Sequence, residues 1–114
     1  MNYTQNSKIA QVTERTLVIG VDIGSEMNYA RAFNWRGQEL SKKVFRFSNS
    51  QEGFQSFSDY LRNNQAIASA EQIIVGCEPT VHYWFTLAKY LKAQHINLAL
   101  VNPYILVIYA SSNA

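Results

Sequence analysis

Cysteine is almost absent from this sequence of 114 residues, and long apolar runs are missing altogether. The single cysteine, Cys77, excludes an internal disulfide, and one cysteine with two histidines cannot form a zinc site without carboxylate ligands. No run reaches the roughly 18 apolar residues that a membrane-spanning helix needs, and the polar N-terminus has no signal-peptide core. These absences predict a soluble, cytoplasmic protein without a membrane partner.

Charge is missing from the last part of the chain. All eight acidic and ten basic residues lie at or before Lys92, and the net charge of +2 is too small to indicate a nucleic-acid partner by itself. The segment from Ile105 to Tyr109 has no polar face to show to water. Either the native chain continues, or this tail docks on the domain or on a second copy. We expect it to be buried against a neighbouring chain, which predicts a homo-oligomer, or to be disordered.

Apolar residues are plentiful enough for the core of one domain, since they make up 47% of the sequence. Residues 1–15 are polar and aperiodic, which predicts a flexible N-terminal arm. Thr16 to Ile23 is a continuous apolar run, typical of a central strand covered on both faces, and Asp22 is its one charged exception. The segments "NYARAFNW" and "LSKKVFRFS" flank the turn former Gly37 and predict a hairpin.

The apolar period then changes to that of a helix. Asn49 is the expected N-cap, and Glu52 follows at the spacing of a capping box. The helix is expected to end near Asn63 or Asn64, with "AIASA" as a connector. Its core-facing residues repeat at helical spacing: Phe54, Phe57 and Leu61.

The second half of the chain alternates strand and helix. "EQIIVGCE" predicts a buried strand that stops at Pro79, and "INLALVN" predicts a last strand before Pro103. Between them lies a helical stripe of Trp84, Leu87, Ala88 and Leu91. The order β-β-β-α-β-α-β, with right-handed crossovers, predicts a mixed five-stranded sheet of order 3-2-1-4-5 with helices packed on it. This α/β architecture is the ribonuclease-H-like, or RuvC-like, fold.

Two carboxylates lie at the carboxyl ends of neighbouring strands in this arrangement. Asp22 is near the end of the first strand and Glu78 ends the fourth, at the edge where open sheets bind ligands. Two adjacent carboxylates repel each other unless a cation lies between them, and oxygen ligands around an open cleft favour Mg²⁺ or Mn²⁺ over zinc. A structural interpretation stays open for both: Asp22 could cap the turn at Gly24, and Glu78 could favour a helix N-terminus.

The sequence resembles a known family in three segments: "IGVDIGSEMNYARAF", "FSNSQEGFQSF" and "IIVGCEPTVHYWFTLAKYLKAQHINLALVNP". Together they are similar to the N-terminal RuvC-like domain of the DEDD transposases, the insertion-sequence transposases of the one-hundred-and-ten class and the Piv-type DNA invertases. The resemblance spans about Leu17 to Pro103. It implies DNA transposition by metal-dependent strand cleavage and joining, with Asp22 and Glu78 as catalytic and metal-binding residues. It also implies DNA as a partner, at the element ends and the target, and a guide RNA as a further partner.

The tail departs from the pattern of this family. The expected domain is residues 16–103, and residues 104–114, "YILVIYASSNA", carry neither a basic helix nor the two remaining Asp residues that the resemblance implies. The chain is then a truncated copy, a frameshifted product or a deliberately shortened piece. By itself it is expected to be inactive, and a non-catalytic DNA-binding or interfering fragment is the alternative function.

Other candidates are weaker. An actin-, Hsp70- or sugar-kinase-like ATP-binding domain is disfavoured because Glu26 would repel phosphate in the turn after Asp22. Basic residues on the hairpin form either a solvated face or a phosphate-contacting strip, and His82 is either a locally bonded helix-start residue or a ligand. The nucleic-acid-binding candidates are Arg31, Arg36, Lys42, Lys43, Arg46 and His82.

Overall fold

The computed structural model describes residues 12–78 and 83–100. Its elements follow the predicted order of strands and helices. They are β1 (Thr16–Ile23), β2 (Met27–Phe33), β3 (Phe45–Ser48), α2 (Gln51–Ala68), β4 (Gln72–Cys77), α3 (Trp84–Ala93) and β5 (Asn97–Leu100). The strands form one mixed sheet of order β3-β2-β1-β4-β5, in which β2 pairs antiparallel to β1 and β3, while β4 pairs parallel to β1 and β5. The predicted fold class is confirmed.

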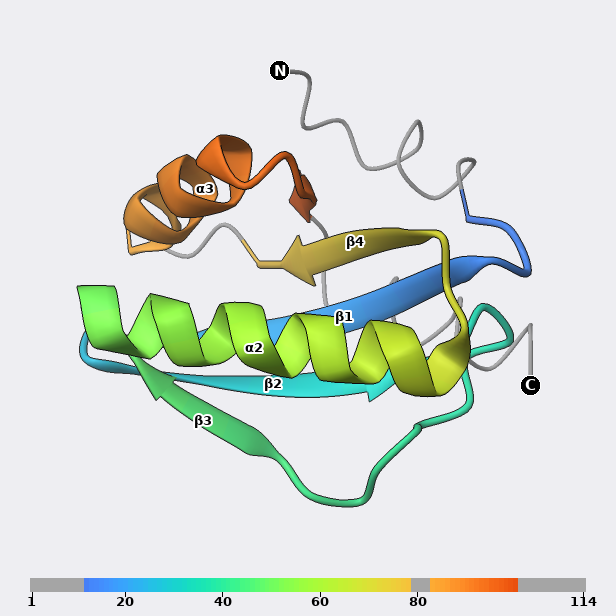
Figure 1. The fold of residues 1–114 in the computed structure, drawn as a ribbon. Helices are drawn as coiled ribbons and strands as arrows, with labels where there is room; N and C mark the ends of the chain where they lie inside the picture. Colours follow the sequence, from blue (N-terminus) through green and yellow to red (C-terminus); the bar gives the residue numbers. More distant parts are fainter. Residues whose placement is uncertain (1–11, 79–82, 101–114) are drawn as a thin grey trace.

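Both described helices pack on the same face of the sheet. Figure 1 shows α2 running across this face, and the rings of Phe54 on α2 and Tyr90 on α3 lie 5.2 Å apart, so the two helices are neighbours. The connection from β3 to β4 through α2 and the connection from β4 to β5 through α3 go in the same direction along the sheet. Right-handed crossovers therefore put both connecting helices on one side. Within the described residues no helix covers the other face.

The hydrophobic core lies between the helices and this face of the sheet. Residues of β1 at alternate positions contribute to it, because successive side chains of a strand point to opposite faces. The largest fully buried side chains include Phe57 and Leu61 of α2 and Leu87 and Leu91 of α3. The ring of Phe57 stacks on Phe47 of β3 at 4.2 Å between centroids, which fixes α2 over the hairpin side of the sheet.

The predicted ends of α2 were wrong at both sides. Its N-cap is Ser50, whose hydroxyl accepts a hydrogen bond of 3.0 Å from the backbone N–H of Gly53. At the other end α2 continues past Asn64, because the amide of that residue donates to the carbonyl of Tyr60 at 2.8 Å and satisfies its polar group along the helix. The stretch predicted as a connector is helical up to Ala68, and Ser69 in the left-handed conformation (φ 51°) ends it.

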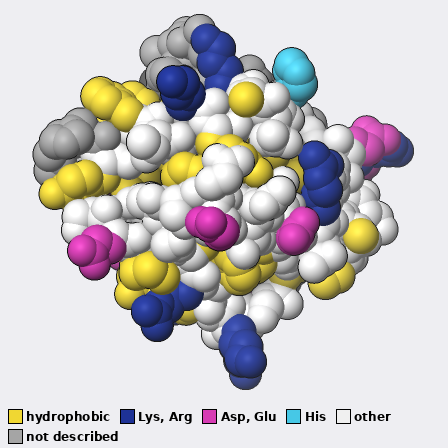
Figure 2. All heavy atoms as spheres, turned by 60° about the vertical axis from the view of Figure 1, so that its left-hand side comes forward, with side chains coloured by type: hydrophobic (Ala, Val, Ile, Leu, Met, Phe, Trp, Pro, Cys, Tyr) yellow, Lys and Arg dark blue, Asp and Glu magenta, His cyan; other side chains and the backbone are white. Residues whose placement is uncertain are grey.

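The third strand is shorter than predicted. Only Phe45–Ser48 pairs continuously with β2, and upstream a single bridge joins Phe33 to Glu39. Lys42 and Lys43 therefore lie in an exposed connecting segment rather than on the sheet. On the side shown in Figure 2, Lys and Arg lie at several separate places and do not form one continuous patch.

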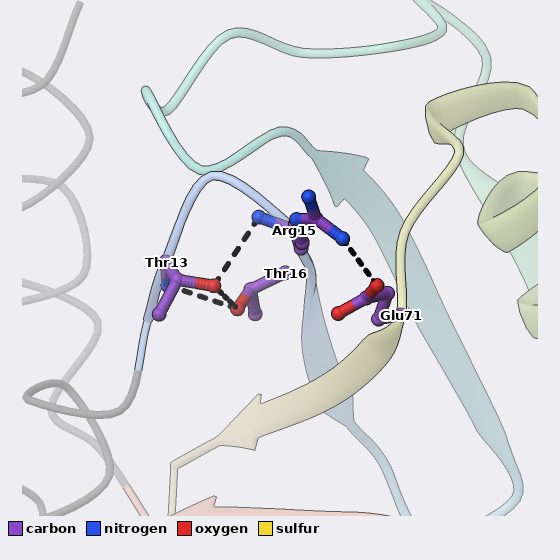
Figure 3. A network of polar contacts seen from close by, with 4 residues as sticks. All are labelled: Thr13, Arg15, Thr16 and Glu71. Carbon is purple, nitrogen blue, oxygen red and sulfur yellow. Dashed lines mark hydrogen bonds and ion pairs between the residues drawn. The ribbon is translucent and has the colours of Figure 1, made fainter.

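A polar network joins the starts of β1 and β4 (Figure 3). The hydroxyl of the buried Thr16 accepts hydrogen bonds from the backbone N–H of Thr13 at 2.9 Å and from the side-chain amide of Gln72 at 2.7 Å. Nearby, the guanidinium of Arg15 forms an ion pair with Glu71. The ion pair is well exposed and contributes at most about 1 kcal/mol, so the buried Thr16 hydroxyl is the stronger restraint on the register of the two strands.

Cys77 lies at the end of β4 with its side chain 1% exposed in the core. Burial disfavours the charged thiolate and raises the pKa of this thiol from 9.0 to about 12. The thiol is therefore a packing group. Because the unfolded chain loses this proton near pH 9, Cys77 favours the folded state below that pH, and its contribution is lost as the pH rises toward 12.

Folded protein is expected to react with an aromatic disulfide reagent at pH 8 at least about 100-fold more slowly than urea-unfolded protein, because burial removes both thiolate and access. The measurement is the release of the coloured thiolate over time. Equal rates for the folded and unfolded chain would contradict the buried position of Cys77.

Candidate functional site

The alternation of β1 decides where its one carboxylate lies. Leu17, Ile19 and Val21 point into the core, so Asp22 points to the opposite face, which the described helices leave open. Its side chain is exposed, although both of its neighbours in the sequence are buried. The first residues of β1 are buried on both faces of the sheet. On the face away from the helices this burial ends at Asp22.

Glu78 reaches the same place from β4. The parallel register ends with Val21 opposite Cys77, and the next residues are Asp22, still in β1, and Glu78, just beyond the end of β4. Both carboxylates are exposed and line one groove of about 610 Å³ on the open face. The structure therefore brings the two predicted site residues together at adjacent strand ends, as the order of the sheet requires.

The middle of the groove has a floor without side chains. Gly20 of β1 pairs with Gly76 of β4 and with Arg31 of β2, so two neighbouring strands present only backbone there. An aromatic and apolar wall stands on the hairpin side. Its residues are Tyr29, Phe33 and Val44. Val21 and Cys77 also border the groove, although their side chains belong to the core.

The turn after Asp22 is held by two asparagines. Asn28, which is fully buried, accepts from the N–H of Gly24 at 3.2 Å and donates to the side-chain oxygen of Asn49 at 2.7 Å. Asn49 donates in turn to the carbonyls of Gly24 at 2.9 Å and Ser25 at 3.0 Å. This is why Asn49 is not the cap of α2: its side chain belongs to the turn. The network fixes the end of β1 against the start of α2.

Comparison with known families gives a match over most of the chain. A family model described as Transposase, that of the DEDD transposases of IS110 type, matches residues 19–113. The chain belongs to this family. No curated protein matches it. The predicted resemblance is confirmed, and membership gives the chain a transposase-type function with DNA as its partner.

The family match has no bearing on the predicted domain boundaries. The match includes most of the tail at residues 104–114, which lies outside the described residues. The departure of the tail from the family pattern and its packing both stay predictions. The predicted arm of residues 1–15 is described only from Val12, which packs against Ile74 and Ala99. No described helix of this transposase chain is long and apolar enough to cross a membrane.

The basic candidates of this transposase chain do not form one strip. Arg31 lines the groove, but its guanidinium is 3.3 Å from the carboxylate of Glu39. Arg36 lies in the hairpin loop with its guanidinium 5.9 Å from the centroid of the Trp35 ring. Arg46 is exposed on β3 and faces the groove side, since it pairs with Tyr29. His82 lies outside the described residues.

The described residues 12–78 and 83–100 contain no cluster of three or more acidic, histidine or cysteine side chains that could hold a metal ion. Asp59, the other Asp of the sequence, is exposed on α2, on the far side of the sheet from the groove. A cation in the groove would therefore have two carboxylate ligands from this part of the chain.

Tyr29 and Phe33 are site residues that sequence analysis missed. Both follow from the hairpin register, in which Asp22 pairs with Tyr29 and Val18 with Phe33. Apolar alternation in "NYARAF" indicates a strand, but the pairing depends on where the chain turns. Asn28 and Asn49 set that point through contacts distant in sequence. A turn placed at Gly24–Met27 would have set Tyr29 opposite Asp22, and so on the same face of the sheet.

The substitution Asn49→Ala is expected to lower the free energy of unfolding by about 1–3 kcal/mol, because it leaves the buried Asn28 amide and two carbonyls without their partner. Urea denaturation measures the loss, and faster amide exchange at Gly24 locates it. Asn63→Ala, at an exposed position of α2, is the control and should change stability by less than about 0.5 kcal/mol. Equal effects of the two substitutions would contradict a restraining role for Asn49.

Proposed function

We propose that this chain forms part of the catalytic domain of a DEDD transposase, in which Asp22 and Glu78 hold a divalent cation for cleavage and joining of DNA strands. The observation that supports the proposal is the position of two exposed carboxylates in one groove, each directly after the last residue pair of β1 and β4. A second carboxylate beside the first is unfavourable in a merely structural surface, since like charges repel. A cation between them removes this cost.

The donor set fits Mg²⁺ or Mn²⁺. Both ligands are carboxylate oxygens, and the thiol of Cys77, the nearest soft donor, is buried on the opposite face of the strand. When bound, such an ion supplies charge neutralisation at the phosphodiester oxygens. Asp22 and Glu78 would bind and orient it, and the asparagine network behind Asp22 would keep that carboxylate at a fixed place.

The turn beside Asp22 argues against the ATP-binding alternative. Phosphate loops use backbone N–H groups that are free to bind the ligand. Here the N–H of Gly24 donates to the carbonyl of Met27 at 3.0 Å and to the Asn28 side chain, and a Cβ at Gly24 would lie 2.6 Å from that carbonyl. The turn is closed on itself, so we favour phosphodiester chemistry at the carboxylates.

Binding without cleavage is the alternative function that we propose for the isolated chain. Phosphodiester transfer requires charge to be neutralised on the attacking and the leaving oxygen, and two ions perform this in two-metal sites. Two carboxylates hold one ion weakly. A homo-oligomer, a guide RNA and a cytoplasmic location remain predictions that accompany the proposal.

Mn²⁺ is expected to broaden the amide resonances of Gly20 to Ile23 and of Cys77 and Glu78 selectively, with a dissociation constant of about 1 mM or weaker, as for sites with few ligands. Asp22→Asn and Glu78→Gln should each abolish the selective broadening, whereas Glu71→Gln, at the other end of β4, is the control and should retain it. Broadening that is unchanged in Asp22→Asn would overturn the metal site.

The isolated 114-residue chain is expected not to nick supercoiled plasmid with Mg²⁺ or Mn²⁺, because the described residues offer no cluster of three or more ligands from which a second ion could be held. The assay compares the wild type with Asp22→Asn after identical purification, so that contaminating nuclease appears in both. Nicking by the wild type that Asp22→Asn abolishes would refute the two-ligand argument and indicate that further ligands come from elsewhere.

A further inference from the structure

Three side chains form a straight row across the open face of the sheet. Asp22 on β1 pairs directly with Tyr29 on β2, and Tyr29 pairs directly with Arg46 on β3. Directly opposed residues share a face, and neighbouring strands are about 4.8 Å apart. The row therefore carries a carboxylate, an aromatic ring and a guanidinium at successive steps, and spans about 10 Å from Asp22 to Arg46.

Tyr29 is placed unlike the two aromatic residues of β3. Its residue is 42% exposed, while its sequence neighbours Asn28 and Ala30 are fully buried on the other face. The rings of Phe45 and Phe47, in contrast, stack on Tyr60 and Phe57 of α2. Tyr29 thus stands on a rigid strand and keeps a ring face available at the edge of the groove.

Arg46 and Arg31 differ in their surroundings. Arg31 is already paired with Glu39, which occupies its guanidinium. Among the described residues no carboxylate lies within ion-pair distance of Arg46, and no aromatic ring lies under its guanidinium. Arg46 is exposed and can therefore take an anion at the end of the row.

We propose that Tyr29 is a positioning residue that stacks on the nucleobase or sugar next to the phosphate held at Asp22 and Glu78, while Arg46 contacts the neighbouring phosphate. An aromatic ring on an open sheet is an established platform for stacking bases, and an adjacent cation follows the backbone. The bare floor at Gly20 and Gly76 leaves room for a ring beside Tyr29 within the groove of about 610 Å³. This inference rests on the proposed function, because it places the phosphate at the carboxylates.

The test uses the 114-residue chain with a fluorescein-labelled 12-nucleotide single strand and the matching duplex, in Ca²⁺ at low salt. Tyr29→Ala is expected to weaken single-strand binding about 5- to 100-fold, as for loss of one stacked base, and Tyr29→Phe should restore it. Phe85→Ala, which removes a 55% exposed aromatic on α3, is the control and should bind as the wild type does. Slow reaction of the Cys77 thiol in each variant shows that it is folded.

Two further measurements separate stacking from a structural role. A strand carrying 2-aminopurine, whose emission falls on stacking, should be quenched by the wild type and Tyr29→Phe but not by Tyr29→Ala. Arg46→Gln should reduce the slope of log K against log salt by about 0.7, whereas Arg62→Gln on α2 should not. Duplex binding that equals single-strand binding and ignores Tyr29 would overturn the inference.

The outcomes distinguish this inference from the proposed function. Selective Mn²⁺ broadening at Asp22 together with binding that is indifferent to Tyr29→Ala would overturn the stacking role and leave the metal site standing. Quenching that depends on Tyr29 without any metal site would support stacking and refute the catalytic proposal. A wild-type chain that is a dimer in solution, and a Tyr29→Ala variant that is a monomer, would also overturn the inference, because Tyr29 would then be an interface residue.

Discussion

The parallel pairing of β1 with β4 is the constraint on which the rest of the structure depends. Its register, Val21 beside Cys77, puts both of these side chains into the core and the following carboxylates side by side on the open face. A slip of one residue would turn Asp22 toward the aromatic residues of α2 and expose Val21 instead, because the side-chain period of a strand is two. The buried half of the sheet therefore fixes the geometry of the exposed half.

The two faces of the sheet differ in what they carry: one packs against the described helices, and the other carries the groove. One face carries both described helices and most of the described core, and a smaller cluster of Ile74 and Ala99 with Val12 lies on the other face. Gly53 makes the close approach of α2 possible, since a Cβ there would collide with the backbone carbonyl of Ser48. The same approach brings Ser50 to its cap position and Asn49 to the β1–β2 turn. Packing of α2 is in this way linked to the place of Asp22.

Most of the fold could be predicted from local patterns, and the part that could not depends on contacts distant in sequence. Apolar runs and helical periods predicted five strands, two helices and their order, and the strand ends predicted Asp22 beside Glu78. Asn49 was assigned to the wrong role because its real partners, Gly24 and Ser25, lie 25 and 24 residues away. Tyr29 was missed because a hairpin register cannot be obtained from alternation alone. The catalytic roles of the carboxylates lie outside what geometry decides.

The charges around the groove explain why metal and DNA should be coupled in this transposase chain. Among the described residues at the groove, the carboxylates of Asp22, Glu78 and Glu39 outnumber the guanidinium groups of Arg31 and Arg46. A phosphate entering this face without a cation meets net repulsion, and exposed charges at this distance are only partly screened by salt. A cation at the carboxylates reverses that sign. By linkage, DNA must then raise the affinity of the groove for the cation by the same factor as the cation raises its affinity for DNA. In the proposed site, the substrate would therefore strengthen the binding of a cation that two carboxylates hold weakly, and the row from Asp22 to Arg46 would give the direction of the strand.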